Sequence, residues 1–128
     1  MQEGEKNIGV VGSWDSPASR AEFQDSACNV FVHGVRDAFF FGPEQIKKVA
    51  ICSGSGASGI QEAMSLGCDA FITGEIKESV PILCEEKGVN LLTFGHHRTE
   101  IFGVRALAEK IQSELNLSAK FVDLDNPV

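Results

Sequence analysis

Short apolar runs alternate along the chain with segments whose apolar residues recur every three or four positions. The runs predict strands at residues 8–12, 35–41, 47–52, 69–74, 89–93 and 119–124. The helical pattern predicts helices at residues 16–32, 60–66, 75–87 and 96–115. Strands that alternate with helices over short connections predict an α/β fold, a mainly parallel mixed sheet with helices packed on it.

Turn and cap residues mark where some of these elements begin and end. Ser16 before Pro17 suits a helix start, because serine caps a helix and proline fits its first position. Gly34 suits the exit of that helix, and His33 beside it reads as a capping or surface residue. Pro81 either lies in the first turn of its helix or kinks it.

Composition narrows the class of protein. A chain of 128 residues, 43% hydrophobic and 23% charged, is typical of one globular domain, and we expect a single domain over residues 1–128 with residues 1–7 frayed. A net charge of -7 argues against a nucleic-acid partner.

No apolar run approaches the roughly 20 residues of a membrane span, and the acidic start lacks signal-peptide features, so we expect a cytoplasmic protein without a membrane partner. The four scattered cysteines read as reduced, buried thiols.

Three loops that follow predicted strands carry the candidate chemistry: residues 53–59, residues 73–75 and residues 95–100. Ligands of open α/β sheets gather at the carboxyl ends of the strands, so these loops should meet at one edge. The first loop, with Ser53 and Ser55, fits a phosphate cradle or equally a tight turn with a serine cap, and it lacks the P-loop ending. Glu75 reads as a helix-start carboxylate that is either a cap or a functional group.

The third loop offers metal ligands. His96 and Glu100 are four residues apart, so a helix that starts here presents both on one face. Their nitrogen and oxygen donors suit zinc, manganese or iron, but two donors are only half a site. His97 should point elsewhere, toward a second shell or a substrate. Arg98 would suit an anion, and Thr99 reads as a helix cap.

Four sequence blocks in order give a more specific signal: residues 49–56, 67–75, 95–100 and 121–127. With these blocks, residues 46–128 resemble the C-terminal half of the Ngg-interacting-factor-three-like family, also called the dinuclear metal-centre or GTP cyclohydrolase type 2 homologue family. The resemblance implies a paired divalent-metal centre in an α/β protein that assembles into homo-oligomeric rings, with His96 and Glu100 matching metal ligands.

The same resemblance implies that further ligands are missing from this chain. Members of the family carry a His-His-Gly motif and other His and Asp ligands in an N-terminal half, and His33 does not stand in such a motif. We therefore expect half of a larger unit. One hypothesis is a metal-dependent hydrolase of a nucleotide-like or phosphorylated, anionic substrate once the other half is supplied, with its catalytic residues unknown. The alternative is a non-catalytic oligomerisation or interaction module with an incomplete metal site.

Overall fold

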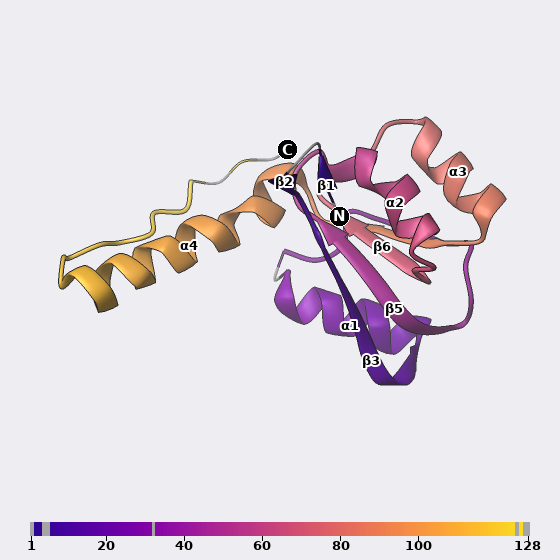
Figure 1. Ribbon diagram of the computed structural model, residues 1–128, viewed down its shortest axis with the longest axis horizontal. Coiled ribbons are helices and arrows are strands. Elements are labelled where there is room, and N and C mark those ends of the chain that lie inside the picture. The colour runs from indigo at the N-terminus through magenta and orange to yellow at the C-terminus, as the bar shows by residue number, and fades with distance from the viewer. Residues whose placement is uncertain (1, 4–5, 32, 125, 127–128) are drawn as a thin grey trace.

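A computed structural model of the protein describes residues 2–3, 6–31, 33–124 and 126. Its centre is a five-stranded sheet in the order β3-β5-β6-β7-β4 (Figure 1). The three middle strands are parallel, and each edge strand is antiparallel to its neighbour. The strands are β3 (Val10–Ser19), β4 (Asp37–Phe40), β5 (Gln45–Cys52), β6 (Ala70–Thr73) and β7 (Asn90–Thr93). The predicted α/β fold with a mixed sheet and a parallel core is confirmed.

Helices cover both faces of this sheet. Successive strand side chains point to opposite faces, so Ile72 and Leu92 pack beneath α1 (Arg20–Val30), whereas Phe71 and Leu91 pack toward the other helices. That second layer consists of the 3-10 helix η1 (Gly56–Gly59), α2 (Ile60–Ser65) and α3 (Ser79–Lys87). The middle strands are therefore buried on both faces, which explains their continuous apolar runs.

The last helix, α4 (His96–Leu115), leaves the sheet and projects away from it (Figure 1). Residues 116–124 run back beside it without regular structure, and the Arg105 guanidinium lies 5.2 Å from the centre of the Phe121 ring. The sequence predicts a strand at residues 119–124, and this prediction is wrong. The segment packs along a helix, and within the described residues it pairs with no strand.

The start of α1 differs from the prediction. The Ser16-Pro17 pair lies inside β3, which continues until Ser19 pairs with Gln45. Ser19 is the cap instead: its hydroxyl accepts from the Glu22 N–H at 3.3 Å, and its own N–H donates to the Glu22 carboxylate at 2.8 Å. This reciprocal arrangement is a capping box, and the hydrogen bonds from Ser19 lower the pKa of Glu22.

The end of α1 and the start of α3 also differ. The helix ends at Val30, and the expected end at Val32 lies outside the described residues. Helix α3 begins at Ser79, so Pro81 lies in its first turn and does not kink it. Glu75 therefore precedes the helix by several residues, and the expectation that it stands at a helix start is wrong.

The beginning of the chain is ordered where it is described. Strands β1 (Gln2–Glu3) and β2 (Lys6–Asn7) pair with each other, where the sequence predicts fraying; Met1, Gly4 and Glu5 of that expectation lie outside the described residues. Across the part of the chain that the structure describes, no helix has both the length and the apolar character to cross a membrane.

The cysteines are thiols. Cys52, Cys68 and Cys84 are buried and Cys28 is half-buried. Burial raises the pKa of the Cys84 thiol to about 11 and also raises that of Cys68.

Candidate metal centre

The three predicted loops meet at one edge of the sheet because they follow three adjacent parallel strands. The Gly54 carbonyl after β5 accepts from the N–H groups of Gly74 (3.1 Å) and Glu75 (3.0 Å), which follow β6. The Gly74 carbonyl accepts in turn from the Gly95 N–H after β7, at 2.9 Å. These bonds continue the ladder past the strand ends and fix the loops relative to one another.

His96, at the start of α4, lies between two carboxylates. Its Nδ1 is 3.0 Å from Glu75 Oε1, and its Nε2 is 3.3 Å from Glu100 Oε2. The hydrogen bond to Glu75 raises the pKa of His96 most, and the charge of Glu100 adds to this effect. The imidazole and both carboxylates are 37–54% exposed, so the group is open to solvent. The predicted pairing of His96 with Glu100 on one helix face is confirmed, and Glu75 joins them.

A glycine beneath the pair makes this arrangement possible. Gly54 has a φ of +61°, a conformation that side chains rarely adopt. A β-carbon there would clash with the Glu100 carboxylate and lie 3.2 Å from His96 Nε2. Only a residue without a side chain therefore lets Glu100 and His96 approach the loop after β5.

Thr99 connects the helix to the loops. Its buried hydroxyl accepts from the Gly54 N–H at 2.8 Å and lies within hydrogen-bond distance of the carbonyls of Gly95 (3.1 Å) and His96 (2.9 Å). The sequence predicts a simple cap, but the N-cap of α4 is Gly95, with a φ of +96° and no capping side chain. The hydrogen bond between Thr99 and Gly54 cannot be predicted from the sequence, because it joins segments that only the sheet brings together.

The remaining predicted site residues lie elsewhere. Ser53 and Ser55 are exposed, and neither hydroxyl makes a hydrogen bond within the described residues. The predicted serine cap is therefore absent from this loop, since α2 has Gly59 as its N-cap. His97 points away from His96, as predicted, and its Nε2 lies 3.1 Å from Asp123 Oδ1.

The donor set fits a metal in type but not in number. His96 Nε2 and Glu100 are suitable ligands, and a carboxylate on the other ring nitrogen, here Glu75, is the usual support of a metal-bound histidine. Within the described residues, however, no group of three or more His, Cys, Asp or Glu side chains is placed to hold an ion. This chain therefore offers two metal donors, His96 and Glu100, and the carboxylate of Glu75, which supports the histidine.

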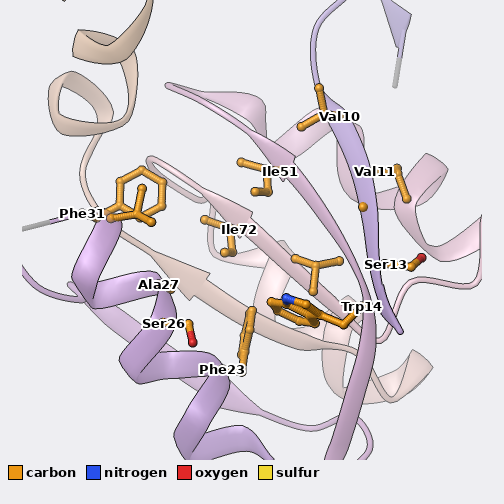
Figure 2. Close-up of a pocket in the computed structure, with 13 residues that line it drawn as sticks. Val10, Val11, Ser13, Trp14, Phe23, Ser26, Ala27, Phe31, Ile51 and Ile72 are labelled. Carbon is orange, nitrogen blue, oxygen red and sulfur yellow. The ribbon is translucent and has the colours of Figure 1, made fainter. Parts of the chain in front are cut away.

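An apolar pocket of about 420 Å³ lies apart from this edge, between α1 and the strands β3 and β5 (Figure 2). Trp14 and Phe23 face each other across it, with ring centres 6.1 Å apart in an edge-to-face arrangement. Its lining contains no ligand-type His, Asp, Glu or Cys side chain. The pocket therefore belongs to the packing of α1 and not to the candidate centre.

Comparison with known proteins places this geometry in a family. The family model Duf34/NIF3 (NGG1p interacting factor 3) matches residues 1–127. The chain belongs to the Duf34/NIF3 family. The resemblance inferred from the four sequence blocks is thus confirmed, including its relationship to the C-terminal half of the family.

Relatives within Duf34/NIF3 are about twice as long as this chain. The "GTP cyclohydrolase 1 type 2 homolog" of Haemophilus influenzae is 35% identical over 127 residues, which are 99% of this chain and 51% of the relative. The Escherichia coli protein of the same name is 43% identical over 86 residues, 67% of this chain and 35% of that protein. A solved structure described as "protein ybgI, unknown function" has a TM-score of 0.88 at 32% identity, over 96% of this chain and 50% of that one.

Proposed function

We propose that this chain supplies one half of a divalent-metal centre, with His96 and Glu100 as ligands and Glu75 as the residue that orients His96. The observation that carries the proposal is the position of His96 between Glu75 at 3.0 Å and Glu100 at 3.3 Å, at the carboxyl end of three parallel strands. The remaining donors would come from a second polypeptide segment, because a bound ion needs at least three protein ligands.

The reaction that fits this donor set is metal-assisted hydrolysis of a nucleotide-like or phosphorylated substrate by the completed protein. The ion would be zinc, manganese or iron, and it would supply a Lewis acid. The residues of this chain do the positioning: Glu75 accepts a hydrogen bond from His96 Nδ1–H, which keeps the proton on Nδ1 and leaves Nε2 free to coordinate. Catalytic groups beyond these would belong to the other half.

Metal titration of the purified chain, followed by NMR of the histidine rings, tests the assignment. Because two donors are half a site, we expect zinc to bind weakly and to shift the His96 ring signals, and we expect His96→Ala and Glu100→Ala to abolish zinc binding, measured by plasma mass spectrometry after equilibrium dialysis. His33→Ala is the matched control, since His33 lies outside the group. Retention of stoichiometric metal by both ligand variants would overturn the proposal.

The alternative function, an interaction module that forms homo-oligomers or pairs with the other half, has its own support. Val104, Leu107 and Leu115 of α4 are 58%, 56% and 62% exposed. Leu117, Val122 and Leu124 of the returning segment are exposed beside that helix. Several exposed apolar side chains on one helix and the segment that runs back beside it are typical of an interaction surface.

Light scattering over a range of concentrations tests this alternative. We expect the chain to associate as its concentration rises, and the double variant Val104→Ser/Leu107→Ser to remain monomeric. Leu66→Ser, at the C-cap that follows α2, is a control, because Leu66 is exposed (42%) but lies apart from this surface. A wild-type chain that stays monomeric at high concentration would contradict the interaction module without affecting the metal assignment.

A further inference from the structure

A polar cleft of about 490 Å³ lies at the start of α4. Its lining comes from three separate parts of the chain: His33 after α1, His97, Arg98 and Ile101 on α4, and Asp123 and Asn126 near the C-terminus. The cleft and the His96–Glu100 pair share the first turns of α4, but successive residues are about 100° apart around the helix axis, so the two open on different sides of the helix. Its volume falls within the roughly 300–1,000 Å³ of small-molecule sites.

Arg98 is the unexplained residue of this cleft. It is half-buried, and within the described residues it makes no ion pair or hydrogen bond. A β-carbon at Gly95 would lie 3.4 Å from Arg98 Cδ, so the arginine stem passes close to the glycine N-cap. Among the described residues no carboxylate pairs with this guanidinium, so its N–H groups are available to a ligand.

Asp123, the acidic residue in the lining of the cleft, already has a side-chain partner. Asp123 Oδ1 lies 3.1 Å from His97 Nε2, so the nearby carboxylate pairs with the histidine. Arg98 and His33 remain as side chains that can donate to a ligand. Ile101 supplies an apolar wall beside them.

We propose that this cleft binds the phosphate group of a phosphomonoester, with Arg98 as its anchor and His33 as a second donor. The planar guanidinium presents paired N–H groups that match two oxygens of a phosphate, and Ile101 would contact the organic part of the ester. The inference rests on the proposed function, because it names a phosphate group as the part of the substrate that this chain would hold at the base of α4, the helix that also carries His96 and Glu100. Asp123 opposes an anion by its charge and limits the affinity.

The test is an NMR titration of the metal-free chain, in the presence of a chelator, with inorganic phosphate and separately with phenyl phosphate. We expect saturable shifts of the Arg98 side-chain Nε–H and of the His33 ring with both probes, and of the Ile101 methyl groups with phenyl phosphate only. Arg98→Ala should weaken binding about tenfold or more, because charge-assisted hydrogen bonds are lost. Asp123→Asn should strengthen binding, and Lys87→Ala on α3 is the charge-matched control that should leave it unchanged.

Arg98→Lys covers the case in which Arg98→Ala does not fold. Lysine keeps the positive charge and loses only the paired N–H groups of the guanidinium, so Arg98→Lys should bind phosphate more weakly than the wild type. Equal affinities in Arg98→Lys, Lys87→Ala and wild type would overturn the proposal, as would shifts that never saturate. Saturable binding of inorganic phosphate but not of phenyl phosphate would overturn the assignment of a phosphomonoester as the ligand and would show a site for inorganic anions.

A further titration with zinc separates this inference from the proposed function. If zinc shifts His96 but phosphate does not shift Arg98, the cleft proposal is wrong and the metal half-site stands. If phosphate binds at Arg98 while zinc leaves His96 unchanged, the cleft is supported and the metal assignment is wrong.

Discussion

The two ends of α4 have opposite surroundings. Its first turn is joined to the sheet, because Thr99 is buried and cross-links to Gly54, and the Gly95 N–H continues the ladder from Gly74. Its outer half has exposed apolar side chains and a returning segment as its neighbour within the described residues. The base of α4 therefore fixes the geometry of the candidate centre, whereas its outer half carries apolar side chains that are open to solvent.

Truncation of a leucine in the sheet and of one in the outer half of α4 should give the largest difference in the free energy of unfolding. Leu91 of β7 is fully buried, and Leu107 of α4 is 56% exposed. We expect Leu91→Ala to lower the free energy of unfolding by about 2–5 kcal/mol, and Leu107→Ala to change it by less than about 0.5 kcal/mol. Urea denaturation of the monomer measures both. A large loss in Leu107→Ala would show that the outer half of α4 packs within the monomer.

Adding one methyl group to a glycine in each region should have effects of opposite sign. A β-carbon at Gly74 would lie 2.6 Å from both the Gly54 carbonyl oxygen and Thr99 Oγ1, and at Gly103 it would meet nothing within 4 Å. We expect Gly74→Ala to destabilise the protein by roughly 1–3 kcal/mol through overpacking. Gly103→Ala should stabilise it by about 0.5–1 kcal/mol, because alanine favours a helix. Equal unfolding midpoints for Gly74→Ala and Gly103→Ala would show that the loops after β5, β6 and β7 are not tightly packed against one another.

The smallest effect concerns the charge at the base of α4. Glu75 is the main cause of the raised pKa of His96, so Glu75→Gln should lower that pKa more than Glu100→Gln does, as measured by NMR titration of the ring. Because the folded state holds the proton more tightly, the stabilisation is complete below the ordinary pKa of about 6.5 and is lost as the pH rises through the folded value. An unchanged His96 pKa in Glu75→Gln would show that the Glu75–His96 hydrogen bond is not formed in solution.

The sequence predicts the parts of the fold that depend on local pattern. The second half of β5 and the strands β6 and β7 are mostly apolar because both of their faces are buried, so they are recognisable without knowledge of their neighbours. The loops that follow them must then meet at one edge, and His96 and Glu100 share a face once α4 begins at residue 96. These features follow from the periods of strands and helices alone.

The features that the sequence does not reveal depend on contacts between distant segments. Ser16-Pro17 has the form of a helix start, but pairing of Ala18 with Ile46 keeps that segment extended. Residues 119–124 have the composition of a strand, yet Phe121 packs on Arg105 of a helix. Glu75 resembles a helix-start carboxylate, and its contact with His96 exists only because β6 and β7 are neighbours.

The buried thiols make the opening of each helical layer measurable by chemistry. Cys52, Cys68 and Cys84 lie in the layer of α2 and α3, whereas Cys28 lies in the layer of α1. A thiol reacts as its thiolate, so a reagent at neutral pH reaches a buried, protonated thiol such as Cys84 only when its layer opens. The order in which the four cysteines are alkylated would therefore report which side of the sheet opens first, with the native residues as the only probes.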